Sequence, residues 1–370
     1  MTPARISELL DAAVRLASRG HGRVEPNPMV GCIITDSTGT IIADGAHRSC
    51  GDAHAEINAL RAAGDRARGS TVLVTLEPCA HRGRTGPCCE ALIAAGVATV
   101  IYAVADANPL ARGGTAVLQA AGVEVMQFDH AKSTELSLPF LKRVRTQLPW
   151  MCAKWAQSID GAVALANGDS QWLSCERSRK LVHRERGRVD AIMTGIGTVL
   201  EDDPRLTARE VRTTRKQQRI VFDPDARTPT DSRVLDGALP TTILARREGD
   251  HGVESRCAQL TDAGARILPL GANDSIIPPL QTLFAEGVST ILIEAGGGLI
   301  GRLVRERLLD EAWVFIAPLL VADDVARRSA RGLAPEVLAS IPRARLMSVR
   351  TRGSDALLHY RWTTAEALNG

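Results

Sequence analysis

The chain has 370 residues, of which 45% are hydrophobic and 24% are charged, and this length favours two domains because domains typically contain about 100–200 residues. Its 45 Lys and Arg residues against 42 Asp and Glu residues give a formal net charge of +3, too balanced to indicate nucleic-acid binding. Eight cysteines are too few for a disulfide scaffold, and no run approaches the roughly 18 apolar residues that cross a membrane. We therefore expect a cytoplasmic protein without membrane partners, whose cysteines serve metal or catalytic roles.

The first third of the chain predicts alternating helices and strands. Apolar residues at helical spacing predict a first helix over residues 6–17, which ends at Gly20-His21-Gly22. After it we expect strands at 30–35, 40–43, 71–76, 97–104 and 123–126, and helices at 53–63, 88–95 and 115–121. This alternation predicts an α/β fold with a largely parallel sheet and helices on its faces.

The alternation breaks around residues 129–150, where a polar run ends at Pro149. We place the domain boundary there, which predicts domains at residues 1–147 and 148–370. The pattern then resumes, with strands expected at 150–156, 191–194, 219–222, 241–245, 266–268, 290–293, 312–317, 345–351 and 356–362, and helices near 174–186, 253–263, 279–286 and 299–307. The second domain is therefore also predicted to be α/β.

Three potential metal ligands stand in the first half. His54 opens an expected helix, Cys79 follows an expected strand, and Cys88 comes after eight intervening residues. One imidazole and two thiolates leave the fourth position of a tetrahedral Zn²⁺ for water, whose pKa the metal lowers to about 7. Glu56 lies two residues after His54, where a carboxylate can take that water's proton without binding the metal. His-x-Glu followed by Pro-Cys and a further Cys is the layout of zinc nucleobase deaminases.

The alternative to a catalytic zinc site is a structural one completed by a fourth thiolate. Cys89 is adjacent to Cys88, but neighbouring thiolates rarely reach one tetrahedral centre, and Glu56 would have no role in a structural site. The remaining cysteines, Cys32, Cys50, Cys152, Cys175 and Cys257, have no assigned function, since free cysteine usually behaves as a small hydrophobic residue.

A glycine-rich turn in the second half indicates a possible phosphate site. Residues 296–301 read Gly-Gly-Gly-Leu-Ile-Gly between an expected strand and helix, where backbone N–H groups can approach an anion at the helix N-terminus. Arg302 adds a cation nearby. The turn comes late in its domain, and no acidic residue follows at the distance that a Rossmann site requires. A glycine-rich helix entry without a ligand therefore remains an alternative.

The motifs together resemble the family of bifunctional riboflavin-biosynthesis deaminase/reductases. The resemblance rests on 54-HAE-56, 75-TLEPC-79, His81, 83-GRT-85, 87-PCC-89 and 26-PNPMVG-31 in the first half, and on Lys154 with 158-SIDG-161, 168-GDSQW-172 and 198-TVLEDDPRLT-207 in the second. The eight-residue spacing between the two Cys ligands is that family's own variant. The resemblance implies a cytidine-deaminase-like three-layer α/β/α domain followed by a dihydrofolate-reductase-like α/β domain.

For the first domain, the resemblance implies that His54, Cys79 and Cys88 bind one Zn²⁺ and that Glu56 moves the proton. The implied reaction is hydrolytic deamination of 2,5-diamino-6-ribosylamino-4(3H)-pyrimidinone 5′-phosphate. The implied substrate contacts are Asn27, His47, His81, Arg84, Asp106 and Asn108. Two positions depart from the family pattern, because Ala107 replaces a usual Pro and Arg82 replaces an aromatic residue or His.

For the second domain, the resemblance implies reduction of the ribosyl arm to ribityl by NADPH. The implied NADPH contacts are Ala156, Trp172, Thr198, Asp202, Gly296, Gly297, Gly298, Leu299, Ile300, Gly301 and Arg302. The implied substrate contacts are Lys154, Ser170, Arg186, Leu206, Arg209 and Glu294. Pro224, the pair Gly297-Gly298 and the long charged stretch 322–331 depart from the family pattern, and these departures can weaken NADPH binding or change its preference.

The expected function is thus a bifunctional enzyme that acts on a small phosphorylated pyrimidine and, by resemblance, forms a homo-oligomer (dimer or tetramer). Three alternatives remain at this point. The reductase half could be degenerate, the zinc site could deaminate another nucleobase, or the chain could be a binding module whose zinc is only structural. The sequence leaves open the choice between NADPH and NADH and whether an intermediate passes directly between the two sites.

Overall fold

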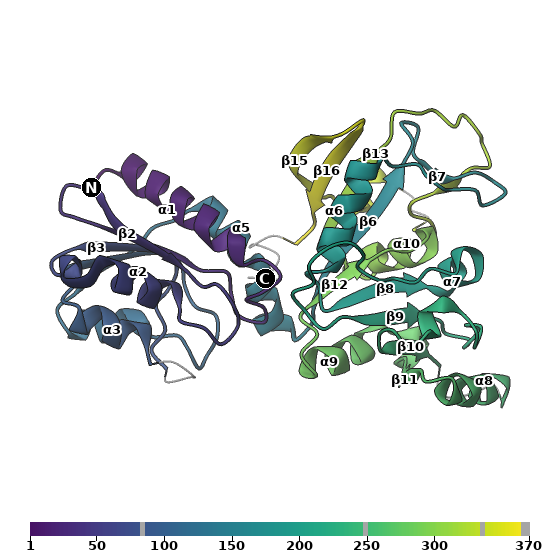
Figure 1. Ribbon diagram of the computed structural model, residues 1–370, viewed down its shortest axis with the longest axis horizontal. Coiled ribbons are helices and arrows are strands. Elements are labelled where there is room, and N and C mark those ends of the chain that lie inside the picture. Colours follow the sequence, from purple (N-terminus) through teal and green to yellow (C-terminus); the bar gives the residue numbers. More distant parts are fainter. Residues whose placement is uncertain (82–85, 247–250, 334–336, 364–370) are drawn as a thin grey trace. The chain divides into compact units, whose positions relative to one another are not determined.

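The computed structural model describes residues 1–81, 86–246, 251–333 and 337–363. Contacts between Cα atoms divide the chain into two compact units, Met1–Thr146 and Gln147–Thr363 (Figure 1). No helix among these residues has the length and apolarity needed to cross a membrane.

The first unit is built on a five-stranded sheet in the order β2-β1-β3-β4-β5. Its strands are β1 (Gly31–Thr35), β2 (Ile41–Ala46), β3 (Thr71–Leu76), β4 (Thr99–Val104) and β5 (Glu124–Gln127). β1 is antiparallel to β2 and β3, whereas β3, β4 and β5 are parallel. Every residue of β1 is buried, as expected for a strand that helices cover on both faces.

Five helices cover this sheet, namely α1 (Pro3–Ala17), α2 (Ala55–Ala63), α3 (Cys88–Ala94), α4 (Gly114–Ala120) and α5 (Ala131–Thr146). α1 and α5 contact each other on one face, and α2 and α3 contact each other on the other face (Figure 1). A Cβ atom at Gly45 would lie 2.3 Å from the carbonyl oxygen of Ala55. Glycine in β2 therefore lets the N-terminus of α2 approach closely, and this fixes the position of His54.

The helix α5 was not expected from the sequence, which predicted only a break in the pattern over this stretch. The helix contains Pro139 in its interior and buries Ser133, Ser137 and Lys142 beside Leu138, Phe140 and Leu141. A proline and several polar residues on the buried face remove the apolar periodicity that predicts a helix. Packing against α1 supplies the stabilisation that local pattern does not indicate.

The second unit contains a nine-stranded sheet in the order β11-β10-β9-β8-β12-β6-β13-β16-β15. Its strands are β6 (Trp150–Gln157), β8 (Ala191–Gly195), β9 (Gln218–Phe222), β10 (Thr241–Ala245), β11 (Arg266–Pro269), β12 (Thr290–Ile293), β13 (Glu311–Ile316), β15 (Arg345–Arg352) and β16 (Asp355–Arg361). The strands from β11 to β13 are parallel, and β16 and β15 add an antiparallel edge. The carboxyl ends of the parallel strands meet at one edge, where α/β proteins bind ligands.

The helices of the second unit are α6 (Glu176–Arg186), α7 (Ile196–Asp202), α8 (His251–Asp262), α9 (Ile277–Ala285) and α10 (Gly297–Arg305). A separate two-stranded ribbon pairs β7 (Ala162–Ala164) with β14 (Arg327–Arg328). α7, β7 and β14 were not expected from the sequence; β7 and β14, with three and two residues, are too short to display a periodic pattern. The other expected elements of both units appear within a few residues of the expected bounds.

Candidate active sites

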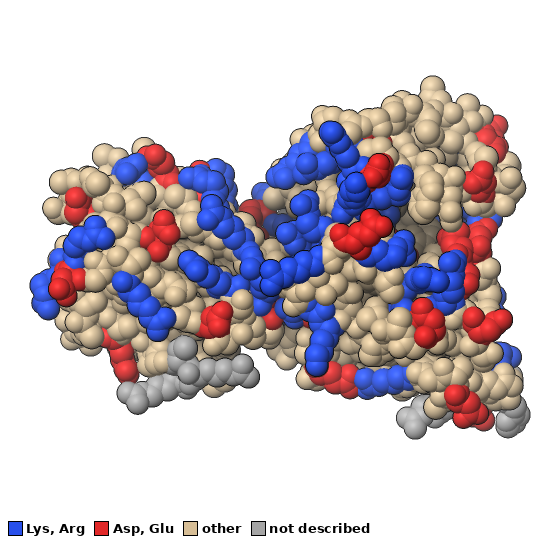
Figure 2. Space-filling view, in the orientation of Figure 1, with Lys and Arg blue, Asp and Glu red and all other residues tan. Residues whose placement is uncertain are grey.

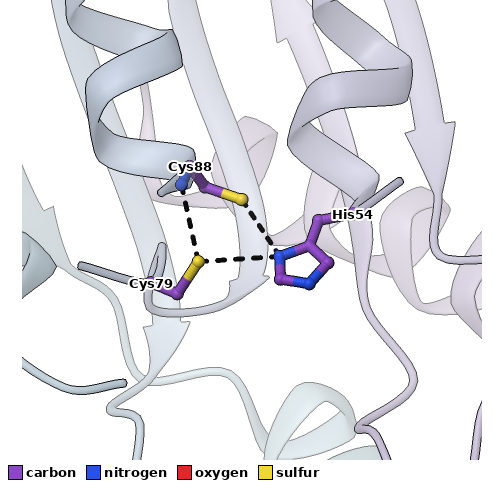
Figure 3. A group of neighbouring side chains, drawn as sticks. All are labelled: His54, Cys79 and Cys88. Carbon is purple, nitrogen blue, oxygen red and sulfur yellow. Dashed lines mark hydrogen bonds between the residues drawn. The ribbon is translucent and has the colours of Figure 1, made fainter. Parts of the chain in front are cut away.

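His54, Cys79 and Cys88 converge in the first unit from three separate segments (Figure 3). His54 is the residue before α2, Cys79 lies three residues beyond the end of β3, and Cys88 begins α3. The Nδ1 atom of His54 lies 3.2 Å from the Sγ of Cys88 and 3.6 Å from the Sγ of Cys79. The backbone N–H of Cys88 donates to the Sγ of Cys79 at 3.4 Å.

These distances fit a tetrahedral zinc ion. Zn–S bonds of about 2.3 Å and Zn–N bonds of about 2.0–2.1 Å place neighbouring ligand atoms about 3.5–3.8 Å apart, and the three candidate ligand atoms all lie within 4.8 Å of one another. Among the described residues, no fourth His, Cys, Asp or Glu joins the group. The set thus leaves one coordination position for water or substrate, which is the property of catalytic zinc sites.

Cys89 does not complete this group. Its side chain is 1% exposed and packs in the apolar core of the first unit, and its backbone N–H donates to the carbonyl oxygen of Cys79 at 3.3 Å. Glu56, by contrast, is 4% exposed and lines the same cavity as His54 and Cys79. Burial raises the pKa of the Glu56 carboxyl above its usual value.

The cavity over these ligands has a volume of about 400 Å³, within the usual size of a small-molecule site. Five of the six expected substrate contacts line it, namely Asn27, His47, His81, Asp106 and Asn108. The sixth, Arg84, lies outside the described residues. The family resemblance therefore predicted most of the polar residues that line the cavity. The positions of the zinc ligands alone would not have predicted them.

His47 is fixed in its orientation and tautomer by two contacts. Its Nδ1 lies 3.1 Å from the carbonyl oxygen of Ala53, which requires a proton on Nδ1. Its Nε2 then accepts a hydrogen bond from the side-chain amide of Asn27 at 3.3 Å. Burial lowers the pKa of His47, so a neutral ring is favoured at this edge of the cavity.

Asp106 and Glu77 also line this cavity. Burial raises the pKa of Asp106 to about 6, and its carboxylate accepts the backbone N–H of Asn108 at 2.8 Å. The carboxylate of Glu77 accepts the backbone N–H of Asp106 at 3.2 Å and both the N–H and the hydroxyl of Thr115 at 3.0 and 2.9 Å. Glu77 therefore ties the loop after β4 to the start of α4.

Several lining residues were not singled out in the sequence. Glu77 and Asp52 carry charge, Cys50 carries a free thiol, and Phe140 contributes an apolar wall from α5. Glu77 stands inside the 75-TLEPC-79 motif, which was a usable signal. Phe140 had none, because the helix that carries it was not expected.

A second cavity of about 850 Å³ lies in the second unit. All six expected substrate contacts of this unit line it, namely Lys154, Ser170, Arg186, Leu206, Arg209 and Glu294. Five expected cofactor contacts line it as well, namely Ala156, Trp172, Thr198, Asp202 and Gly296. These residues come from β6, α6 and α7, from the loop after β12, and from the segments before α6 and after α7. The cavity therefore lies at the carboxyl edge of the parallel strands.

Glu294 is the charged centre of this cavity. Its carboxylate accepts hydrogen bonds from the Nε and a terminal nitrogen of Arg186 at 2.5 and 3.0 Å, and from the Nζ of Lys154 at 3.5 Å. Burial alone would raise the pKa of Glu294, but the charges of Arg186 and Lys154 outweigh burial and lower this pKa to about 2. Glu294 thus remains ionised and holds both cations in place.

The glycine-rich turn differs from the expectation in what its glycines contact. Gly296 precedes α10 and lines the cavity, and its N–H donates to the hydroxyl of Thr198 at 3.3 Å. A Cβ atom at Gly297 would lie 2.6 Å from the carbonyl oxygen of Arg328, and one at Gly301 would lie 1.9 Å from that of Arg331. These two glycines therefore permit the chain around β14 to pack against α10.

The structure places the remainder of that turn away from the cavity lining. Gly297, Gly298, Leu299, Ile300, Gly301 and Arg302 are not among the lining residues. Arg302 donates to the carbonyl oxygen of Asp274 at 2.6 Å, forms an ion pair with Glu306 at 2.7 Å and lies over the ring of Phe222. The sequence predicted a turn and a helix at these residues, but it did not predict which of them line the cavity.

The sequence also left eight charged lining residues of this cavity unassigned, namely Glu176, Arg179, Lys180, Glu201, Arg205, Glu210, Arg233 and Arg327. Arg327 forms an ion pair with Glu201 and comes from the charged stretch that departs from the family pattern. Arg179 lies over the ring of Trp172, with its guanidinium carbon 4.9 Å from the ring centre. Arg327 and Glu201 are 126 residues apart in the chain, and the contact of Arg179 with Trp172 depends on the path of the segment before α6. Sequence spacing predicts neither contact.

Both halves of the chain match known protein families. Residues 3–104 match the cytidine and deoxycytidylate deaminase zinc-binding region, and residues 149–358 match the RibD C-terminal domain. The riboflavin biosynthesis protein RibD of Escherichia coli (strain K12) is 38% identical over 363 residues, which cover 94% of this chain and 96% of that protein. The protein of the same name from Bacillus amyloliquefaciens is 34% identical over 94% of each chain.

Solved structures agree with these matches over nearly the whole chain. Acinetobacter baumannii RibD has a TM-score of 0.81 and 33% identity, and the match covers 98% of this chain and all of that one. The diaminohydroxyphosphoribosylaminopyrimidine deaminase/5-amino-6-(5-phosphoribosylamino)uracil reductase of Thermotoga maritima has a TM-score of 0.80 and 27% identity, with 98% and 99% coverage. The expected fold class, a cytidine-deaminase-like domain followed by a reductase domain of the α/β class, is confirmed. The chain therefore belongs to the RibD family and is a bifunctional riboflavin biosynthesis enzyme with a deaminase domain and a reductase domain.

Proposed function

We propose that the deaminase domain is zinc-dependent and acts on 2,5-diamino-6-ribosylamino-4(3H)-pyrimidinone 5′-phosphate, and that the reductase domain uses NADPH to convert the ribosyl arm of the product to ribityl. The observation that carries the first half is the open three-ligand group beside Glu56 in a cavity of about 400 Å³. The second half is supported by the cavity of about 850 Å³ and its partly buried Arg186–Glu294–Lys154 group.

In the deaminase cavity, His54, Cys79 and Cys88 would hold the zinc ion, which when bound supplies a Lewis acid that makes water nucleophilic at neutral pH. Glu56 takes the proton from the attacking water and passes it to the leaving amino group, which departs as ammonia. The neutral Nε2 edge of His47, with Asn27, provides hydrogen-bonding groups for the pyrimidine ring. Asp106, Asn108 and His81 supply the remaining polar wall.

In the reductase cavity, Ala156, Trp172, Thr198, Asp202 and Gly296 would contact NADPH, which when bound supplies the hydride. The nearest atom to a Cβ placed at Gly296, which lines the cavity, would lie 3.8 Å away, so a phosphate can approach the backbone of this glycine. Glu294 orients Arg186 and Lys154 toward the substrate, and Arg209 and Ser170 add donors for its phosphate. The hydride would add at C1′ of the ribosyl arm as the ring C–O bond breaks, and the released ring oxygen would take a proton from solvent.

The test supplies the purified, zinc-loaded protein with the pyrimidine phosphate, with and without NADPH. We expect ammonia release without NADPH, followed by loss of nicotinamide absorbance when NADPH is added. Absence of ammonia, with cytosine and other nucleobases compared as substrates, would contradict the first half. Ammonia release without NADPH oxidation would instead leave a deaminase with a degenerate reductase, and NADH in a parallel sample tests the cofactor preference.

We further propose domain bounds of 1–147 and 148–370, a cytoplasmic location and a homo-oligomer of two or four chains. The family matches at 3–104 and 149–358 and the two compact units support the domain bounds. Sedimentation velocity of the purified chain tests the oligomer, for which a species of one chain mass would be the contrary result.

A further inference from the structure

A third cavity, distinct from the two described above, lies beside α6 in the second unit. Its volume is about 370 Å³, and we call it the α6 basic pocket. It is lined by α6, by the loop after Leu206 and by the turn between β15 and β16, with Arg177, Lys180, Leu181, His183, Arg184, Arg209, Glu210, Val211, Thr351, Arg352 and Gly353. Arg177, Lys180 and Arg184 are three and four residues apart and share one face of the helix.

The charges in this pocket are poorly balanced. Five cationic side chains face a single carboxylate, that of Glu210. Lys180 forms an ion pair with Glu176, but within the described part of the chain no carboxylate pairs with Arg177, Arg184, Arg209 or Arg352. The buried Nε atom of Arg352 has no hydrogen-bond partner there. Elsewhere in the same unit Arg186, Arg215 and Arg266 each have an acidic partner.

The walls of the pocket are held by polar contacts rather than by the cations themselves. The carboxylate of Asp355 accepts the N–H of Cys175 at 2.8 Å and the hydroxyl of Ser178 at 2.6 Å, which attaches the β15–β16 turn to the start of α6. The thiol of Cys175 donates to the carbonyl oxygen of Arg352 at 3.0 Å. On the other side the N–H of Arg209 donates to the Nδ1 of His183 at 3.3 Å.

The pocket adjoins the reductase cavity. Lys180, His183, Arg209 and Glu210 line both spaces. Burial and the neighbouring charges of Arg186 and Arg209 lower the pKa of His183, and burial together with Arg186 and Arg205 lowers the pKa of Arg209. Lys and Arg side chains gather over the region of α6 in Figure 2, with some Asp and Glu side chains among them, and in the lining of the pocket itself the cations outnumber the carboxylates.

We propose that the α6 basic pocket binds a phosphate monoester and holds the phosphate of the incoming pyrimidine before the pyrimidine enters the reductase cavity. Guanidinium groups that lack a carboxylate partner suit a phosphate dianion, because planar paired donors match its oxygens. A positive surface beside a cavity also raises the rate at which an anionic substrate arrives. The statement that the bound phosphate belongs to the pyrimidine substrate rests on the proposed function, whereas phosphate binding itself does not.

The binding arm uses inorganic phosphate as the probe and requires no turnover. All five tryptophans lie in the second unit, so tryptophan emission during heating reports its unfolding. At constant ionic strength set with sodium chloride, we expect phosphate to raise the melting temperature of the full chain. The exposed double substitution Arg177→Gln/Arg184→Gln should reduce that increment by at least half. Arg307→Gln/Arg343→Gln removes two exposed charges that line neither cavity and should leave it intact.

Phosphate bound in the reductase cavity contributes equally to all three proteins, so the difference isolates the α6 basic pocket. An equal increment in all three, or no increment in the wild type, would overturn the proposal. This outcome is separable from a failure of the proposed function, because the measurement does not depend on ammonia release or NADPH oxidation.

A kinetic experiment identifies the molecule whose phosphate the pocket binds. With the deaminated pyrimidine phosphate as reductase substrate, Arg177→Gln/Arg184→Gln should lower kcat/KM about ten-fold, mainly through KM, and the effect should shrink as salt is added. With the dephosphorylated pyrimidine, the same variant and the wild type should not differ. A loss of phosphate binding without a change in kcat/KM would show that the pocket holds free phosphate and would overturn its role as an outer substrate site.

Discussion

The guanidinium of Arg186 and the carboxylate of Glu294 meet through two hydrogen bonds of 2.5 and 3.0 Å, with only 14% and 11% of the two side chains exposed. Arg186 ends α6 and Glu294 follows β12, 108 residues later in the chain. This pair joins the helix that carries the α6 basic pocket to the strand edge that forms the reductase cavity. Breaking the pair should therefore affect the second unit and leave the first unit unchanged.

Glu294→Gln removes the charge that compensates Arg186 and Lys154. Removing one partner of a buried ion pair typically costs about 3–5 kcal/mol, so tryptophan-detected denaturation should show a loss of that size together with loss of NADPH oxidation. Ammonia release should persist. Glu286→Gln is the matched control, because its partner Arg266 is 47% exposed and the pair lies on the surface, where such pairs contribute about 0.2–1 kcal/mol. Equal losses in both variants would contradict this account.

The same carboxylate predicts how stability depends on pH. The pKa of Glu294 is about 2 in the folded chain against an ordinary value of 4.5, so its contribution is fully present above pH 4.5 and is lost as the pH falls toward 2. Glu311, whose pKa is lowered by His359 and Arg361 against the effect of burial, acts in the same direction. The wild type should therefore lose stability more steeply than Glu294→Gln over this range, as measured by chemical denaturation. Parallel pH profiles would rule out the assignment.

Substitution by alanine should destabilise the protein at Gly301 but not at Gly298, although both glycines belong to the same turn. Gly301→Ala places a Cβ atom 1.9 Å from the carbonyl oxygen of Arg331, whereas the nearest atom to a Cβ at Gly298 is 3.8 Å away. We expect Gly301→Ala to cost about 1–3 kcal/mol through overpacking and Gly298→Ala to be tolerated in the absence of cofactor. Thermal unfolding followed by tryptophan emission measures both. Stable Gly301→Ala protein would show that the chain around β14 does not pack against α10 as described.

Two cysteine substitutions distinguish the proposed zinc ligands from the neighbouring thiol of Cys89. Cys79→Ser removes a proposed ligand, so the purified protein should contain far less than one zinc per chain by metal analysis. Cys89→Ser changes a side chain that packs in the core and should retain one zinc per chain. Loss of zinc from both variants would favour a structural site in which Cys89 is the fourth ligand, the alternative that the sequence left open.

The sequence was sufficient for the features that depend on local spacing. The strands of both sheets were predicted because their short apolar runs are bounded by turn residues, and His54, Glu56, Cys79 and Cys88 were recognised because their order carries the chemistry. Phe140 was not predicted as a wall of the deaminase cavity, because Pro139 and polar residues hide the helix α5. Gly297 and Gly301 were predicted to contact NADPH, and their close packing against residues 328–331 could not be predicted from local spacing.

The α6 basic pocket could likewise not be predicted from the sequence. Arg177 and Arg352 stand 175 positions apart in the chain and meet only because Asp355 attaches the β15–β16 turn to Cys175 and Ser178. Neither residue belongs to a motif, and an arginine-rich helix alone is typical of a solvated face. Long-range contacts, rather than composition, turn these residues into a cavity.

The most direct test of the account is the activity of Glu56→Gln. This substitution preserves size and removes the carboxylate that we propose moves the proton, while the three proposed zinc ligands His54, Cys79 and Cys88 are unchanged. We predict one zinc per chain by metal analysis and a fall in ammonia release of about 10²–10⁴-fold, the usual contribution of a general acid–base group, with NADPH oxidation of the separately supplied deaminated substrate unchanged. Zinc-loaded Glu56→Gln that releases ammonia at the wild-type rate would contradict the central claim.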